Sequence, residues 1–516
     1  MGEEMRNNLS RTHAALLNSS IASIGQIATL VMQFVARTFF IHILGQQYLG
    51  LNGLFTNILT FLNFAELGIG SAITYALYQP LASDNKPQIA ALMRQFKKWY
   101  QYIALVVTVG GLILTPFLPY LVHNQATNFV NVYIAFLLAL GNTVASYLVS
   151  YKRTLLIANQ QGYLNTINTI GYSLVQQIVQ VICLLLYANF YLYLFIQLLF
   201  MVISNIHVSH VVDKMYPYLD DYRNERVDGN TLSYFKKNIV GMLSSKIGGI
   251  VVNGTDNILL SYFIGLDAVG LYSNYTLILN GLTNVLNQAV TSVASSVGNL
   301  AASHGTQEKQ KRVFYNYYAL STLLVLFATV GFTAFSSTFI RYWIGSRYIY
   351  TQLPLFLIAL NFYFQGIRQP VITYTNAYGL YWYARYKSIF ESIVNLVISV
   401  VLIKFTGLGI SAVLLGTISS NVLVNLWWEP LIVFKWGLKK GYLKFMLLNV
   451  IYIILGVSML GLIVYSTQII DYNNILLNIL TTAGFELLMF IIFLIVTRLF
   501  SANIFNVKVL LAKIKR

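Results

Sequence analysis

The sequence predicts an all-α membrane protein of about 14 transmembrane helices, arranged as two pseudo-symmetric six-helix bundles followed by two further helices. Two observations predict the class. Only 9% of the 516 residues are charged and 57% are hydrophobic, whereas a soluble globular chain has roughly 25% charged residues. The mean hydropathy is +0.66, and apolar runs long enough to cross a bilayer as a helix, roughly 20 residues, recur along the whole chain. A third observation, an internal repeat, predicts the two bundles.

The apolar runs are expected to be helices, because they lack the ten-residue alternation of barrel strands. They lie at residues 18–44, 51–79, 100–122, 129–150, 168–187, 191–212, 239–264, 269–299, 316–336, 353–379, 388–403, 409–428, 445–466 and 475–497.

The formal net charge of +17 has two explanations, a nucleic-acid partner or positive-inside topology. With the N-terminus inside, 27 of the 33 basic residues fall in tails and loops on one side, including Lys152 and Arg153 between the fourth and fifth runs. Three fall on the opposite side and three within runs. This bias predicts that both termini are cytoplasmic and leaves no reason to expect nucleic acid.

The two halves of the chain resemble each other. A shift of 220 residues places the segment at 44–51 on 264–271, so that Gly45 and Gly50 fall on Gly265 and Gly270. A shift of 219 places Ala158 on Ala377. Repeats of this kind build many secondary transporters. The predicted domains are 1–212, the first lobe with helices 1–6; 213–238, a cytoplasmic linker; 239–430, the second lobe with helices 7–12; and 431–516, helices 13–14 with a basic tail.

Several runs carry polar residues at helical spacing, so that these residues share one face. Such faces predict a central polar cavity suited to polyhydroxylated substrates, and the alternative is hydrogen bonding between helices. The stripe in the fifth run, around Gln176 and Gln180, coincides with that in the eleventh, around Asn395 and Ser399, under the 219 shift. The residues singled out for the cavity are Gln26, Gln33, Asn280, Asn284, Asn287 and Gln365.

Ionisable residues within the runs are costly in a bilayer and therefore indicate function. Arg37, Arg368 and Lys246 are predicted to be cavity cations that bind an anion such as a diphosphate.

The acidic residues Glu66 and Asp256 are candidates for gating or ion coupling. The alternatives are internal ion pairs, Arg37 with Asp256 and Arg368 with Glu66, and a Lys246 that extends to the interface. An Arg37–Asp256 pair is also expected to close the outer side of the cavity. Glu391 is expected to extend to the interface or cap a helix.

Signatures of catalysis and ATP use are missing from the sequence. It has no Gly-x4-Gly-Lys-Ser/Thr loop, no His-Glu-x2-His motif and one cysteine, Cys183. These absences favour a transporter that is not an enzyme and has no metal or other cofactor, with transport that is either secondary or driven by removal of the product. The coupling ion, H⁺ or Na⁺, stays open.

Two segments resemble a known family: Asn63-Phe-Ala-Glu66-Leu-Gly68-Ile-Gly70, and the stretch from Asp256 to Tyr272 that contains Gly265 and Gly270. They are similar to the polysaccharide (repeat-unit) flippases of the multidrug/oligosaccharidyl-lipid/polysaccharide (MOP) exporter superfamily. The resemblance implies alternating access and a cargo of undecaprenyl-diphosphate-linked oligosaccharide. It also implies a place in the bacterial cell membrane beside a polysaccharide polymerase and glycosyltransferases, in the synthesis of capsule, exopolysaccharide or O-antigen.

Two relatives of that family compete with this interpretation. Lipid II flippases also have fourteen spans but hold a denser set of cavity arginines in the first lobe, where this chain has Arg37 alone within its runs. Multidrug and toxin extrusion (MATE) antiporters have twelve spans and use acidic residues, which keeps Glu66 and Asp256 of interest. A membrane-bound glycosyl- or acyltransferase would need clustered His or Asp at a membrane face, and the sequence shows none.

Overall fold

The computed structural model describes residues 11–63, 69–122, 130–159, 161–222, 225, 227, 255–302, 307–469 and 475–501. Every regular element in these ranges is a helix, which confirms the predicted all-α class. The chain divides into two compact units, Met1–Ser273 and Asn274–Arg516. The predicted linker at 213–238 lies largely outside the described ranges, and the predicted domain boundaries stay predictions.

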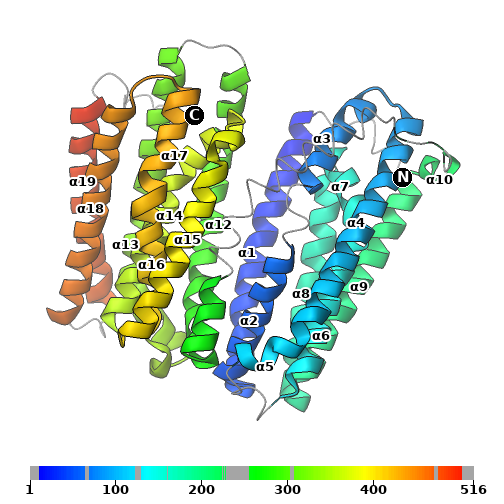
Figure 1. Cartoon of the computed structure of the whole chain (residues 1–516), viewed down its shortest axis with the longest axis horizontal. Helices are drawn as coiled ribbons and strands as arrows, with labels where there is room; N and C mark the ends of the chain where they lie inside the picture. The colour runs from blue at the N-terminus through cyan, green and yellow to red at the C-terminus, as the bar shows by residue number, and fades with distance from the viewer. Residues whose placement is uncertain are drawn as a thin grey trace. The chain divides into compact units, whose positions relative to one another are not determined.

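Unit 1 is built around α1, which packs along α8, and around α6 and α8, which both pack on α9 (Figure 1). A further helix covers 255–263, and α12 (Leu266–Ala302) begins in this unit. The other helices of unit 1 are α1 (Arg11–Ile43), α2 (Gln46–Leu62), α3 (Ile69–Ala82), α4 (Lys86–Leu114), the 3₁₀ turn Thr115–Phe117, α5 (Leu118–Leu121), α6 (Val132–Tyr147), α7 (Ser150–Ala158), α8 (Gly162–Tyr187), α9 (Phe190–Met215) and α10 (Tyr218–Asp221).

Unit 2 is centred on α14, which packs against α13, α16 and α18. The α15 helix packs along α16, and α19 packs along α13 and α18. The helices are α13 (Gln307–Trp343), the 3₁₀ turn Ser346–Tyr348, α14 (Gln352–Ala377), α15 (Tyr381–Phe405), α16 (Ile410–Ser420), a π turn Asn421–Asn425, α17 (Leu426–Ile432), a second π turn Val433–Gly437, α18 (Tyr442–Ile469) and α19 (Ile475–Ser501).

Buried aromatic side chains join α18 and α19 to the rest of unit 2. Tyr318 on α13 donates a hydrogen bond to Asn449 Oδ1 on α18 at 2.6 Å, and Tyr452 stacks on Phe493 of α19 with ring centroids 4.8 Å apart. Such pairs stabilise packing beyond their buried area. The two helices predicted to follow the second lobe therefore pack directly on unit 2.

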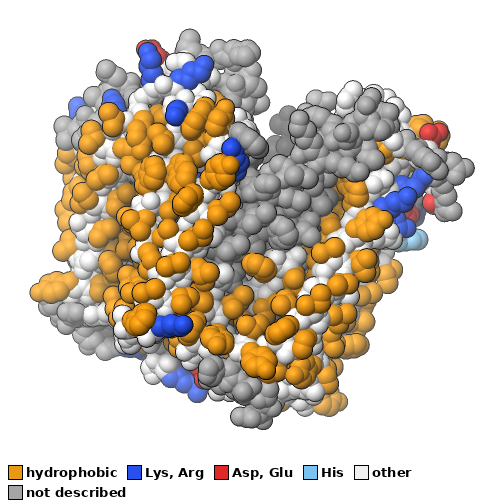
Figure 2. Space-filling model, in the orientation of Figure 1, with side chains coloured by type: hydrophobic (Ala, Val, Ile, Leu, Met, Phe, Trp, Pro, Cys, Tyr) orange, Lys and Arg blue, Asp and Glu red, His pale blue; other side chains and the backbone are white. Residues whose placement is uncertain are grey.

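Nine helices within the described ranges are long and apolar enough to cross a membrane, or ten if the bent pair α6 and α7 counts as one span. The axes of that pair differ by 40°. Figure 2 shows hydrophobic side chains along the sides of the helices in each unit, with Lys and Arg gathered toward helix ends. Large apolar side chains on α15, such as Ile393 and Val397, are 53% and 54% exposed, as expected where lipid is the solvent. The exact count of fourteen stays a prediction.

The helix boundaries confirm the internal repeat. Under the 220 shift, the first residue of α2, Gln46, falls on the first residue of α12, Leu266. Under the 219 shift, α7 and α14 end together and α8 and α15 begin together. Gly45 and Gly265 precede their helices with φ of 96° and 119°, a region that favours glycine because a Cβ clashes there. The same turn is thus built twice.

The two copies of the repeated glycine also contact each other. A Cβ atom on Gly50 would lie 1.9 Å from the carbonyl oxygen of Leu266, and one on Gly270 would lie 2.5 Å from that of Gln46. The α2 and α12 backbones therefore cross where neither helix has a side chain, as in small-residue helix contacts in membranes.

Basic residues that the sequence placed in loops lie on helices instead. The α4 helix begins at Lys86, where Asn85 accepts a hydrogen bond from the backbone N–H of Gln88, and it carries Arg94. Lys152 and Arg153 lie on α7. The physical reason is that Lys and Arg are good helix formers, so a helix continues past its apolar run until a cap or turn ends it.

The crossing predicts that Gly50→Ala and Gly270→Ala each destabilise the protein by about 1–3 kcal/mol or more, because the added methyl overpacks against backbone. The matched control is Gly461→Ala on α18, where nothing lies within 4 Å; it should be neutral or slightly stabilising. Thermal unfolding midpoints of the purified variants measure the difference. Equal midpoints for all three variants would contradict the close crossing.

Candidate functional site

A buried cluster of charged residues in unit 2 is centred on Arg368 of α14. Its guanidinium forms a bidentate pair with Glu429 of α17: Nε donates to Oε2 at 3.0 Å and Nη2 donates to Oε1 at 2.7 Å. Two parallel charge-assisted bonds of this kind are strong and fix the orientation of both groups.

Two residues of α15 complete the cluster. Lys387 Nζ donates to Glu429 Oε1 at 2.8 Å and to Glu391 Oε2 at 3.0 Å, while Arg368 Nη2 lies 3.6 Å from Glu391 Oε1. The ion cluster, Arg368, Lys387, Glu391 and Glu429, thus holds two cations and two anions and is neutral. Its side chains are only 7–12% exposed.

Two asparagines of the π turn support the cluster. Asn421 Oδ1 accepts from Arg368 Nη1 at 2.5 Å, and Asn425 Nδ2 donates to Glu391 Oε1 at 2.6 Å. Asn421, Asn425 and Glu429 follow at i, i+4 and i+8, so that one helix lines one side of the cluster. A π turn inside a transmembrane helix is unusual and often lies at a functional site.

The structure corrects one expectation here and adds a partner of Arg368 that the sequence analysis did not name. Glu391 does not extend to an interface, because it is 6% exposed and pairs with Lys387 and Arg368. The acid that neutralises Arg368 in this part of the chain is mainly Glu429, whereas Glu66 lies outside the described residues. The apolar run predicted at 409–428 stops one residue before Glu429, whereas the helix continues through the second π turn. Its spacing from Asn421 was the available signal.

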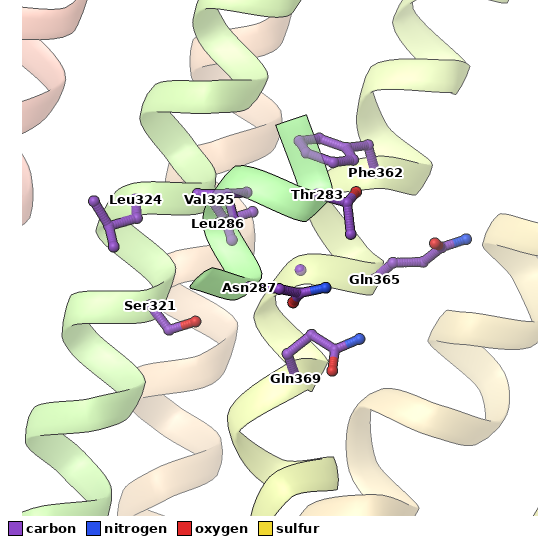
Figure 3. Close-up of a pocket in the computed structure, with 10 residues that line it drawn as sticks. Thr283, Leu286, Asn287, Ser321, Leu324, Val325, Phe362, Gln365 and Gln369 are labelled. Atoms are coloured by element: carbon purple, nitrogen blue, oxygen red, sulfur yellow. The ribbon is translucent and has the colours of Figure 1, made fainter. Parts of the chain in front are cut away.

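A small pocket lined by both polar and apolar side chains lies between α12, α13 and α14 of unit 2 (Figure 3). Its volume is about 60 Å³, and two of the predicted cavity residues, Asn287 and Gln365, line it together with Gln369, Thr283 and Ser321. Gln365 and Gln369 lie one turn apart on α14 and flank Arg368 in sequence, so the pocket and the ion cluster occupy neighbouring faces of one helix.

The other predicted residues are placed as follows. Asn280 and Asn284 are exposed on α12, Gln33 is exposed on α1, and Gln26 is half-buried there. Arg37 Nη1 donates to Ser273 Oγ at 2.9 Å. Asp256 is half-buried in the helix at 255–263, and Lys246 lies outside the described residues. The assignment of all these residues to a cavity, and the Arg37–Asp256 pair, stay predictions.

Part of each polar stripe on the equivalent helices α8 and α15 is buried between helices. Asn395 donates to Thr417 Oγ1 at 2.9 Å, and Ser399 lies against Gly416 of α16. Gln180 donates to the Tyr193 carbonyl at 2.9 Å. For these three residues the geometry favours the alternative, hydrogen bonding between helices.

Metal binding finds no support in this part of the molecule. Across the described ranges, no group of three or more His, Cys, Asp or Glu side chains is arranged to hold a metal ion. The four charged side chains of the ion cluster instead neutralise one another.

The family of the chain follows from comparison with known sequences. A sequence model of the family described as "Polysaccharide biosynthesis protein" matches residues 15–295, more than half of the chain. The chain belongs to this family. No curated protein matches the sequence.

Solved structures show how this member of the family folds. One similar structure is the lipid II flippase MurJ in an inward closed conformation: TM-score 0.60, 13% identity, with 93% of this chain and 99% of that chain covered. Another is a MATE family multidrug resistance transporter of the MOP superfamily in an inward-facing conformation, with a TM-score of 0.56, 12% identity, and 83% of this chain and 99% of that chain covered. A Vibrio cholerae MATE transporter has a TM-score of 0.54 and 14% identity, with 83% of this chain and 98% of that chain covered. These similarities confirm the predicted fold.

The neutrality of the ion cluster makes a prediction about stability. Glu429→Gln leaves a buried cation without its partner, and Arg368→Gln leaves a buried anion, so each is expected to cost about 3–5 kcal/mol. The double variant keeps the Lys387–Glu391 pair and neutrality, and should cost clearly less than the sum of the two. Thermal unfolding of the wild type, the two single variants and the double variant measures the coupling energy between Arg368 and Glu429.

The control for this cycle is an exposed pair, Lys86 with Asp84, 3.9 Å apart with side chains 42% and 70% exposed. Asp84→Asn should change stability by less than about 1 kcal/mol. Additive effects of Arg368→Gln and Glu429→Gln would show that the two side chains are not coupled.

Proposed function

We propose that this protein is a flippase that moves undecaprenyl-diphosphate-linked oligosaccharide repeat units from the cytoplasmic to the outer leaflet, for capsule, exopolysaccharide or O-antigen-type polysaccharides. The main support for this proposal is that the chain belongs to the polysaccharide biosynthesis family, whose model matches residues 15–295. The fold, similar to that of a lipid II flippase and of MATE transporters, supports alternating access.

Amides at the pocket between α12, α13 and α14 support a sugar substrate. Asn287 and Gln369 place their amides at this pocket, which Gln365 also lines, and each amide both donates and accepts hydrogen bonds. Sugar hydroxyls need partners of both kinds. The pocket holds little volume in this conformation, so the proposal requires it to widen when the cavity opens.

The diphosphate is assigned to the cations Arg37, Lys246 and Arg368. For Arg368 the ion cluster adds a condition, because two carboxylates already balance Arg368 and Lys387. Protonation of one carboxylate would give the cluster a net positive charge and release an N–H fork for the anion. We therefore favour H⁺ over Na⁺ as the coupling ion.

The setting is proposed from the charge distribution and the family. Both termini are assigned to the cytoplasm and the protein to a bacterial cell membrane, where a polysaccharide polymerase and glycosyltransferases would consume and supply the substrate. Transport is its activity, and no catalytic residue is assigned.

The Arg368→Gln/Glu429→Gln variant tests the role of Arg368 in transport. The variant keeps the cluster neutral, so it should insert and fold, yet lose flipping because the guanidinium is gone. Proteoliposomes with a fluorescent polyprenyl-diphosphate oligosaccharide measure the rate, with a membrane-impermeant quencher reporting the exposed leaflet. Gln101→Leu, an exposed amide on α4, is the control and should transport normally.

Wild-type rates in a well-folded double variant would remove Arg368 from the mechanism. The same vesicles loaded with lipid II, or with a lipophilic cationic drug, test the two competing functions. Faster movement of either than of the oligosaccharide carrier would contradict the proposed substrate.

A further inference from the structure

The pocket between α12, α13 and α14 has an apolar end and a polar end. Figure 3 shows Leu324, Val325 and Phe362 toward one end, and Asn287, Ser321 and Gln369 toward the other. The spacing along the helices agrees, because Val325 lies one turn from Ser321 on α13 and Phe362 lies two turns from Gln369 on α14. The volume of about 60 Å³ is far below the roughly 300 Å³ of a pocket that takes a whole small ligand. In this conformation the pocket therefore suits one substituent of a sugar ring.

The polar end offers groups that lack partners in the protein. Ser321 is 3% exposed, and its hydroxyl makes no hydrogen bond in the part of the chain that the structure describes. The same holds for the side-chain amide of Gln369. A buried hydroxyl without a hydrogen bond costs free energy, and a ligand group that both donates and accepts would offset that cost.

The apolar end is narrow and closed. Val325 and Phe362 are 4% and 8% exposed, and a Cβ atom on Gly366 would lie 2.4 Å from Val325 Cγ1. The hydroxyl of Thr283, which also lines the pocket, is already used, because it donates to the Leu279 carbonyl at 2.8 Å. A methyl group suits this end, whereas a hydroxyl would lose its hydrogen bonds there.

The polar end is the one nearer to Arg368. Gln369 follows Arg368 directly on α14, while Phe362 precedes it by six residues, about 9 Å along the helix axis. The diphosphate assigned to Arg368 is bonded to carbon 1 of the sugar next to the carrier. A substituent on carbon 2 of that sugar would therefore meet the polar end first and point toward the apolar end.

We propose that this pocket recognises a 2-acetamido group on the carrier-proximal sugar. The amide N–H and carbonyl of that group pair with Ser321 and Gln369, and its methyl contacts Val325 and Phe362. A hydroxyl at carbon 2 is too short to fill the apolar end. The inference rests on the proposed function and narrows its substrate class to carriers whose first sugar is N-acetylated.

Flipping of two matched substrates by the full-length protein in proteoliposomes tests the proposal. Both are fluorescent polyprenyl-diphosphate disaccharides that differ at carbon 2 of the first sugar, which bears an acetamido group in one and a hydroxyl in the other. At concentrations well below saturation the acetamido substrate should flip roughly 10- to 100-fold faster, as expected for one buried methyl and two hydrogen bonds.

Two variants locate the preference in the pocket. Ser321→Ala and Gln369→Leu should each lower the ratio of the two rates about fivefold, through loss of one hydrogen bond. Ser321→Ala should not lower the thermal unfolding midpoint, because the hydroxyl has no partner to lose. The matched control is Ser336→Ala on the same helix, where the serine is also 3% exposed and without a partner but does not line the pocket; it should keep the wild-type ratio.

Equal rates for the two substrates with the wild type would overturn the inference and leave the proposed function standing, whereas flipping of neither would contradict both. A wild-type ratio in folded Ser321→Ala and Gln369→Leu, or an equal loss in Ser336→Ala, would remove the pocket from recognition. Faster flipping of a substrate whose first sugar is a 6-deoxy sugar with a 2-hydroxyl would assign the apolar end to a ring methyl and overturn the proposal.

Discussion

The high free energy of an unpaired charge in a medium of low dielectric constant is the constraint on which unit 2 depends. Arg368 and Lys387 come from different helices and share the carboxylates of Glu391 and Glu429. Once these groups leave water they must meet, and their meeting fixes how α14, α15 and α17 pack. The π turn at Asn421–Asn425 follows from the same need, because both of its asparagines bond to charged side chains of the cluster.

The repeat supplies the frame on which this constraint acts. The helices α2 and α12, which follow the two copies of the glycine turn, cross at Gly50 and Gly270. Equivalent helices begin and end at matching positions of the repeat. Within the frame the halves have diverged in charge, since Arg368 has carboxylate partners and Arg153 on α7 bonds to amides and hydroxyls. In the account proposed above, the carboxylate partners give unit 2 a proton-dependent contact with the transported diphosphate.

The fold class, the repeat and the importance of Arg368 could be predicted from the sequence, because each depends on local composition or on spacing along one chain. The partners of Arg368 could not be predicted, because they depend on which helices become neighbours. Glu429 was missed for a local reason, a helix that continues past its apolar run. The buried stripe residues Asn395 and Ser399 show the limit of periodicity: it places residues on one face and does not say whether that face meets water or another helix.

The central claim is that the neutral ion cluster accepts a diphosphate only by gaining a proton. The direct measurement is the calorimetric heat of binding of a short-chain polyprenyl-diphosphate oligosaccharide to the purified protein, in buffers of different ionisation enthalpy at one pH. The account predicts an uptake of about one proton per bound substrate, because the bound anion stabilises the protonated cluster. Heats of binding that do not depend on the buffer would mean that no proton is taken up, and would contradict the account.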